Sequence, residues 1–274
     1  MTTKSLVFAA LSIGYALCAA ADTNSFRWPN EKGAAVCLTY DDSLASQLDV
    51  AYPQLEEAGL KGTFFLQGNG RTMNDRLDDW RDVASAGHEL ASHSLFHPCR
   101  KALPGRDWVA ANRDLDQYSL DRVRSELEIT NTLLHAIDGQ STRTFAYPCG
   151  DTAAEHGESS FLPIADDLFV ASRGVYSNLG SIRDLDFNNT PGFDPSGKDL
   201  SASIAYLEDC YEKGTVAVFL MHGVGGDYLV TDAELHQALL DYLVENQDRF
   251  WIDTFKNVMT HAHAEFQRLG WDER

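Results

Sequence analysis

The chain has 274 residues, with 22 lysines and arginines against 41 aspartates and glutamates, so its formal net charge is −19. Nucleic acids and anionic lipids repel such a chain, and we exclude both as expected partners. The length suits one domain with a large core, and no Gly/Ser linker, low-complexity tract or internal repeat divides it. The charge is compatible with neutral or cationic substrates, although solubility alone also explains it.

The first 21 residues have the pattern of a secretory signal peptide. Lys4 precedes an apolar run over residues 6–17, and a stretch of small residues ends at Ala21. The apolar run is too short for a transmembrane helix. We therefore expect residues 1–21 to be removed, and residues 22–274 to act as a secreted or periplasmic domain without membrane attachment.

Strand and helix patterns alternate along the rest of the chain. Apolar, β-branched runs predict strands at residues 36–39, 62–66, 88–94, 142–147, 168–172, 181–187, 215–221 and 251–255. Helical periodicity predicts helices at residues 44–58, 75–86, 107–137, 200–213, 231–246 (with a Thr231/Glu234 capping box) and 256–268. This alternation predicts an α/β fold with a parallel sheet, and seven or eight such units predict a single-domain barrel.

Two adjacent carboxylates, Asp41 and Asp42, follow the first predicted strand. Side chains alternate along a strand, so two neighbours can face one site only where the strand ends. The alternative is that Asp42 or Ser43 caps a helix that begins near Leu44. This stretch alone leaves both interpretations open.

Two histidines, His93 and His97, follow the third predicted strand. They precede Pro98 and have no glutamate between them, so a loop is favoured over the helical metalloprotease motif. With Asp42 they form a set of two imidazoles and one carboxylate, which can hold a divalent metal and leave positions open for water and substrate. We expect zinc, with cobalt, nickel, manganese or iron as alternatives. The alternative is that they are ordinary surface or core histidines without a metal.

The polar candidates share one position in the predicted fold, because each follows the C-terminal end of a strand. They are Asp41, Asp42, His93, His97, residues 147–150 and His222. In a barrel these strand ends meet on one face, where active sites lie. We therefore expect a single shared site.

Four short motifs follow one another along the chain: TYDDS at residues 39–43, HSLFH at 93–97, AYPCG at 146–150 and LMH at 220–222. In this order and spacing they resemble the polysaccharide deacetylase family, carbohydrate esterase family four, over nearly the whole mature chain. The resemblance implies a deformed (β/α)7-8 barrel whose metal-dependent site removes acetyl groups from a carbohydrate. The substrate would be an N-acetylated sugar or an O-acetylated polysaccharide such as xylan.

The resemblance also implies a role for each matching residue. Asp41 would be the general base, Asp42, His93 and His97 the metal ligands, His222 the general acid, and the backbone N–H of Cys149 a donor to the oxyanion. For His222 the alternative is an ordinary satisfied histidine at a strand end.

The chain departs from the family at two points. The third motif usually begins with an arginine that steadies the base, but Ala146 stands here, and Arg143 and Arg173 are the candidates to replace it. The fourth motif usually supplies an aspartate and a tryptophan, but only Asp184 and Asp186 are found, without a tryptophan. Asp186 would either influence the acidity of His222 or be exposed to solvent. Because the arginine is missing, the function could instead be that of a non-catalytic, carbohydrate-binding relative. A further alternative is a relative that cleaves a small amide.

Four cysteines remain after the expected cleavage. Cys99 and Cys149 each follow a proline beside a motif, so a shared face would bring them close enough for a disulfide, which an exported protein can keep. The alternative is two independent buried thiols. Cys37 in a core strand and Cys210 on a helix are expected to be structural.

Aromatic residues are candidates for a sugar-stacking platform. The set comprises Trp28, Trp80, Trp108, Tyr118 and Tyr228. Tyr228 is the strongest candidate for the rim of a site, because it lies in a glycine-rich loop after His222.

Overall fold

The computed structural model describes residues 25–175 and 178–271. The predicted signal peptide lies outside this range. The strands are β1 (Ala34–Asp41), β2 (Thr63–Leu66), β3 (Glu89–Ser92), β4 (Phe145–Ala146), β5 (Ala153–Ala154), β6 (Ser159–Ser160), β7 (Ser172–Arg173), β8 (Val216–Met221) and β9 (Phe250–Ile252). The helices are α1 (Tyr52–Ala58), α2 (Arg71–Asp75), α3 (Leu77–Ser85), α4 (Leu120–Asp138), α5 (Leu162–Leu168), α6 (Leu200–Lys213), α7 (Ala233–Glu245) and α8 (Phe255–Leu269).

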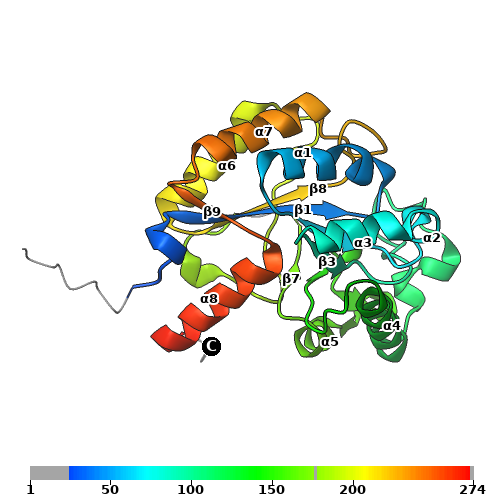
Figure 1. Ribbon diagram of the computed structural model, residues 1–274. Coiled ribbons are helices and arrows are strands. Elements are labelled where there is room, and N and C mark those ends of the chain that lie inside the picture. Colours follow the sequence, from blue (N-terminus) through cyan, green and yellow to red (C-terminus); the bar gives the residue numbers. More distant parts are fainter. Residues whose placement is uncertain (1–24, 176–177, 272–274) are drawn as a thin grey trace, which may run out of the picture.

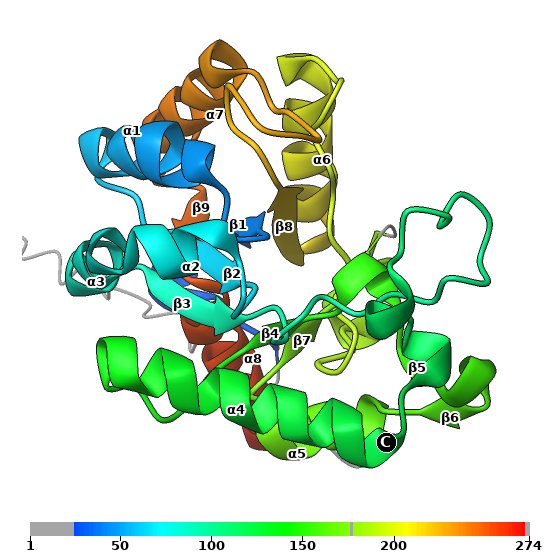
Figure 2. The ribbon, with the colours of Figure 1, turned by 90° about the vertical axis from the view of Figure 1, so that its right-hand side faces the viewer.

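The main sheet is parallel and follows the order β7-β4-β3-β2-β1-β8, with β9 also paired to β1. Helices surround the curled sheet, as Figures 1 and 2 show. Isolated parallel bridges from Thr190 to Arg173 and from Phe193 to Phe219 link the β7 end to β8. The predicted deformed (β/α) barrel, forming a single domain, is thereby confirmed. Among the described residues, no helix is both long and apolar enough to cross a membrane.

The central strand β1 is buried along its whole length. Val36, Leu38 and Tyr40 pack into the core beneath the outer helices, whereas Ala35 and Cys37 pack into a second core inside the curled sheet. By the same alternation Asp41 belongs to the inner face.

The strand then ends, because Asp42 and Ser43 adopt φ angles of 82° and 57°. The break in the alternation allows the second carboxylate to turn toward the same site as the first. Neither Asp42 nor Ser43 caps a helix, since the Ser43 hydroxyl donates to the Gln67 carbonyl at 3.3 Å. The helix-cap interpretation of this stretch is therefore wrong.

The helix predicted over residues 107–137 is correct only in its second half, where α4 begins at Leu120. The preceding segment runs instead as a loop with short 3₁₀ turns. Its carboxylates hold the loop after His97: Asp114 accepts from the Lys101 N–H at 3.1 Å, and Asp116 accepts from Arg100 Nε at 2.7 Å. These tertiary bonds outweigh local helical propensity.

Three smaller expectations are also wrong. Residues 181–187 contain the 3₁₀ turn Ile182–Asp184 in place of a strand, and Leu185 packs into the inner core. The helix predicted over residues 75–86 is divided at Arg76 into α2 and α3. The capping box of α7 does not form, because its N-cap position is Asp232 and the Thr231 hydroxyl makes no hydrogen bond to the described residues.

Cys99 and Cys149 lie at disulfide distance, with their sulfurs 1.99 Å apart and 50 positions between them in the sequence. Cys37 and Cys210 are buried free thiols, as expected. Closing a loop of this length contributes about 4 kcal/mol in the chain-entropy model.

We therefore expect the Cys99→Ser/Cys149→Ser variant to lose up to about 4 kcal/mol of unfolding free energy in urea titrations. Reducing agent should lower the stability of the native protein and leave that of the variant unchanged. Alkylation of unfolded, unreduced protein should label Cys37 and Cys210 alone among these four cysteines. Labelling of all four would contradict the bond.

Candidate metal and catalytic site

A cavity of about 790 Å³ opens at the C-terminal ends of the strands. Its lining includes all six residues that the sequence singled out: Asp41, Asp42, His93, His97, Cys149 and His222. The strand-end argument predicted this convergence. Gln67 and Arg113 also line the cavity, and sequence reasoning missed them because neither belongs to a recognisable motif.

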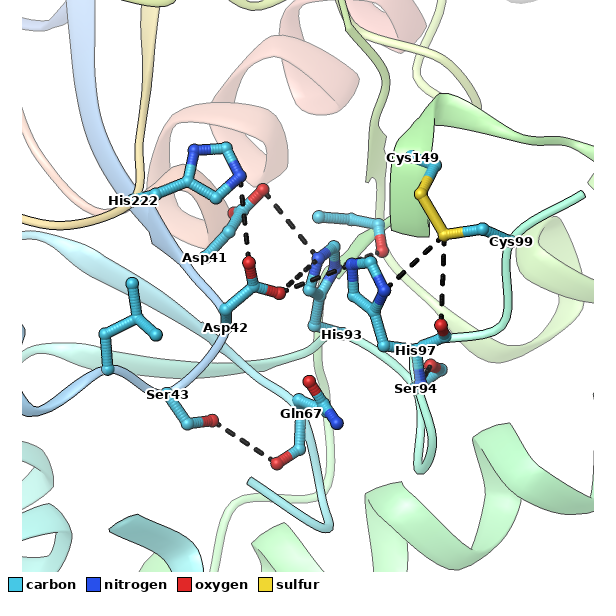
Figure 3. A network of polar contacts seen from close by, with 12 residues as sticks. Asp41, Asp42, Ser43, Gln67, His93, Ser94, His97, Cys99, Cys149 and His222 are labelled. Atoms are coloured by element: carbon cyan, nitrogen blue, oxygen red, sulfur yellow. Dashed lines mark hydrogen bonds and ion pairs between the residues drawn. A yellow bond between two sulfur atoms is a disulfide. The ribbon is translucent and has the colours of Figure 1, made fainter. Parts of the chain in front are cut away.

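Asp42, His93 and His97 line this cavity, and their side chains point toward one another (Figure 3). Asp42 Oδ1 lies 3.4 Å from His93 Nε2 and 3.3 Å from His97 Nε2. One ligand atom from each of the three residues falls within 4.8 Å of the others. His93 Nδ1 lies 2.8 Å from the Ala146 carbonyl, which can only accept, so Nδ1 carries the proton and Nε2 presents its lone pair to the site.

The two oxygens of Asp42 differ in their surroundings. The Tyr228 hydroxyl donates to Oδ2 at 2.7 Å, and Oδ1 is buried without a hydrogen bond from any described residue. A buried carboxylate oxygen without a partner is costly. Because this oxygen lies 3.4 Å from His93 Nε2 and 3.3 Å from His97 Nε2, the set fits one divalent cation bound through Oδ1, with Tyr228 orienting the carboxylate.

The electrostatics of the trio favour an ionised carboxylate. Burial opposes ionisation of Asp42, but the His93 contact and the charges of His97 and His222 outweigh it and hold the pKa of Asp42 well below its usual value. For His97, burial and the neighbouring His93 lower the pKa to about 4, so its ring is neutral at neutral pH. A neutral imidazole is the form that binds metal.

Asp41 is buried beside the trio and pairs with Arg173, whose Nη2 donates to Asp41 Oδ2. Burial opposes ionisation of Asp41, but the Arg173 guanidinium, together with His93 and His222, outweighs it and lowers the pKa of this carboxyl. Arg173 is the register partner of Ala146 on the adjacent strand β7. The arginine missing from the third motif is thus supplied one strand further along the sheet. Arg143 points elsewhere and pairs with Asp138 at 2.5 Å.

His222 follows β8 and places Nε2 3.8 Å from Asp42 Oδ2. Its Nδ1 is buried and has no hydrogen-bond partner among the described residues. Asp184 and Asp186 are both exposed; Asp184 accepts from the Ser181 hydroxyl, and Asp186 accepts from the Asn188 backbone N–H. Neither is bonded to His222, so of the two alternatives left open for Asp186 the structure favours the solvated one.

Cys149 also lines the cavity. Its φ is 58°, and no described residue accepts a hydrogen bond from its N–H. A second group of donor atoms, His97, Cys99 and Cys149, also meets the spacing of a metal site. Since the two sulfurs lie at bonding distance, they are unsuited to that role, and the group with Asp42 is the better candidate.

The outer wall of the cavity is apolar. Trp108, Tyr228 and Leu229 line it and are 62%, 50% and 52% exposed. Tyr228 therefore lies at the rim as expected, together with Trp108. The other aromatic candidates, Trp28, Trp80 and Tyr118, are buried in the cores.

A family model described as polysaccharide deacetylase matches residues 29–160. This part of the chain is similar to the polysaccharide deacetylase family. The match includes Asp41, Asp42, the two histidines of the HSLFH motif and Cys149, and ends before Arg173 and His222. The resemblance predicted from the motifs is confirmed.

Two of the solved structures with a similar fold carry descriptions from this family. One is from Mycobacterium smegmatis and provisionally assigned as a polysaccharide deacetylase, with 18% identity, TM-score 0.57, and coverage of 87% of this chain and 93% of that one. The other is BA3943 from Bacillus anthracis, described as a CE4 family pseudoenzyme, with 21% identity, TM-score 0.51, and coverage of 85% and 66%.

A curated relative, gellan lyase from a Bacillus species, is 22% identical over 86% of this chain and 10% of its own length. The chain spans between 10% and 51% of the lengths of the curated relatives it matches.

The pair between Arg173 and Asp41 is expected to stabilise the folded protein. Arg173→Ala leaves the Asp41 charge buried and unpaired, so we expect a loss of about 3–5 kcal/mol in unfolding free energy. Register partners project to the same face, so adding Ala146→Arg should recover more than half of this loss. Ala146→Arg with Arg173 retained should destabilise by crowding.

Urea unfolding of the four proteins in this cycle measures the coupling between the two positions. A cost below about 1 kcal/mol for Arg173→Ala would contradict an essential ion pair, because that is the range of an exposed pair. Lack of recovery in the double variant would show that an arginine at position 146 does not reach Asp41.

Proposed function

We propose that this chain is a metal-dependent hydrolase that removes acetyl groups from a carbohydrate. The observation that carries the proposal is the cavity in which an arginine-paired carboxylate, a two-histidine, one-carboxylate cluster and His222 meet. The match of residues 29–160 to the polysaccharide deacetylase family model supports it. The exposed Trp108 and Tyr228 at the rim suit a sugar ring, which stacks on aromatic faces.

Asp42, His93 and His97 would hold the divalent ion, for which we propose zinc. When bound there, the ion supplies Lewis-acid polarisation of the acetyl carbonyl and lowers the pKa of water. The donor set of two nitrogens and one oxygen is also compatible with cobalt, nickel, manganese or iron.

The protein residues would divide the proton transfers between them. Asp41, ionised through its pair with Arg173, takes a proton from the water that adds to the acetyl carbon. The free N–H of Cys149 donates to the carbonyl oxygen as negative charge develops there. His222 in its protonated form delivers a proton to the departing alcohol oxygen or amine nitrogen as its bond to the acetyl carbon breaks, and acetate is released.

The second candidate function is carbohydrate binding without catalysis. The observation that favours it is His222, whose Nδ1 has no bonded carboxylate in the described structure to stabilise its protonated form. BA3943, which shares the fold, is described as a pseudoenzyme. Acetate release by the wild type decides between the two functions.

Export is part of the proposal. We propose that residues 1–21 direct the chain out of the cytoplasm, where a bond between Cys99 and Cys149 would persist and hold the loop of His97 against the loop of the Cys149 N–H. N-terminal sequencing of the protein recovered from the culture medium or periplasm tests this, with Asp22 expected as the first residue.

The two adjacent aspartates allow a paired test. Asp41→Asn keeps the size and hydrogen-bonding capacity of the side chain but cannot act as a base, so we expect it to retain metal and lose about 10²- to 10⁴-fold in acetate release. Asp42→Asn should lose both metal and activity, because it removes one of three ligands. Metal content by elemental analysis and acetate release are measured on the same preparations.

The substrates are acetylated xylan, chitooligosaccharides and peptidoglycan, each with and without chelator. Wild-type turnover by Asp41→Asn would show that another group is the base. Metal binding by wild type without acetate release from any substrate would favour the binding protein.

A further inference from the structure

A second, polar cavity of about 570 Å³ adjoins the first. Asp42, Gln67, Arg113 and Tyr228 line both cavities. Of the three candidate metal ligands, Asp42 therefore lies on the common wall, whereas His93 and His97 line the first cavity. One cavity is walled by exposed apolar side chains, and the other is lined mainly by polar and charged ones. A sugar chain with its acetyl group at Asp42 would therefore extend into the polar cavity as well.

Most charged groups that line the polar cavity have partners within the protein. Arg71 pairs with Asp75 at 3.2 Å, and Arg76 pairs with Asp49 and Asp79, each at 2.6 Å. The remaining aspartates are also engaged. Asp227 accepts from the Ser46 N–H at 2.8 Å, and Asp42 belongs to the histidine cluster.

Arg113 differs from these groups, because it makes no ion pair with any described carboxylate. The Arg113 charge acts on Glu126, but that carboxylate is paired with Arg122 at 3.1 Å. With the Asn69 amide turned so that its oxygen faces the guanidinium, Arg113 Nη2 donates to that oxygen at 2.9 Å. A guanidinium has five N–H donors, so most of its donors remain available to the cavities.

The position of Arg113 is fixed by its backbone. The Arg113 carbonyl accepts from the Cys99 N–H at 3.2 Å, and a parallel bridge joins Cys99 to Asp114. The segment is thereby tied to the loop that carries His97. Arg113 is also partly buried, which restricts it further. A partly buried, positioned guanidinium without a counter-ion is expected to bind an anionic group of a ligand.

From this arrangement we propose that Arg113 binds a carboxylate on the acetylated carbohydrate. The substrate class is then an acetylated sugar chain that contains a uronic acid, on the acetylated sugar or on its neighbour. A carboxylate matches the planar fork of the guanidinium and can accept two parallel hydrogen bonds from it. The inference rests on the proposed deacetylase function and restricts the class of substrates on which it would act.

The net charge of −19 opposes a long anionic polymer at a distance. This repulsion between exposed charges is screened beyond about 8 Å at physiological salt, whereas a contact with Arg113 inside the cavity is not. The local cation thus provides selectivity that the overall charge of the chain does not.

The test compares acetylated oligosaccharides containing uronic acid with their methyl esters, which keep the acetyl groups and lose the charge. Suitable pairs are oligosaccharides of acetylated glucuronoxylan and of hyaluronan. We expect the wild type to prefer the acid by about 10- to 100-fold in kcat/KM, the range of a charge-assisted hydrogen-bonded pair. Arg113→Gln should reduce the acid-to-ester ratio to near one, and Arg113→Lys should retain part of it.

Arg71→Gln is the matched control. It removes the same charge from the lining of the same cavity, but the Arg71 side chain is 93% exposed and already paired, so the preference should persist. Equal use of acid and ester by the wild type would overturn the proposal. An equal loss on both substrates in Arg113→Gln would do so too, since it would indicate a structural role for Arg113.

A separate measurement distinguishes failure of the proposed deacetylase function from failure of the Arg113 proposal. If the wild type releases acetate from neither charged nor neutral substrates, calorimetric binding of the acid and its ester to wild type and Arg113→Gln replaces the kinetic comparison. Tighter binding of the acid that depends on Arg113 would support the subsite, and equal binding of acid and ester would overturn it.

Discussion

The site depends on the buried ion pair between Asp41 and Arg173. Arg173 is fully buried at the end of β7, and three strands separate it from β1 in the sheet order. The pair therefore spans the inside of the curled sheet and requires the curl. Two charges removed from water are tolerated only when they are paired, so the same contact couples closure of the barrel to an ionised carboxylate. Gly192 leaves room for the arginine, because a Cβ there would lie 3.2 Å from Arg173 Cδ.

Residues with unusual backbone angles direct the functional groups toward the cavity. Asp42, His97 and Cys149 have φ angles of 82°, 53° and 58°, in the left-handed region that non-glycine residues rarely occupy. Each such residue costs about 1–3 kcal/mol and persists only where surrounding contacts hold it. Here those contacts include the Tyr228 hydroxyl on Asp42 and the close approach of the Cys99 and Cys149 loops. Some stability is given up to place three groups on one cavity.

The periodicity of the sequence predicted the barrel and the convergence of the motif residues, because strand ends in a parallel barrel share one face. The replacement of the family arginine by Arg173 could not be predicted. It depends on the register of two-residue strands, which leave no pattern in the sequence. The segment before Leu120 was misread because its aspartates make tertiary bonds. For Asp41 and Asp42, the adjacent carboxylates indicated a strand end, but this stretch alone left the helix-cap alternative open.

The most direct test of the proposed site is to locate the metal. A crystal of the protein grown with zinc would be measured by anomalous diffraction on both sides of the zinc absorption edge. We predict one strong peak at about 2.0–2.2 Å from Asp42 Oδ1, His93 Nε2 and His97 Nε2, with the Tyr228 hydroxyl still bonded to Oδ2. No peak at saturating zinc, or a peak between His97, Cys99 and Cys149, would contradict it.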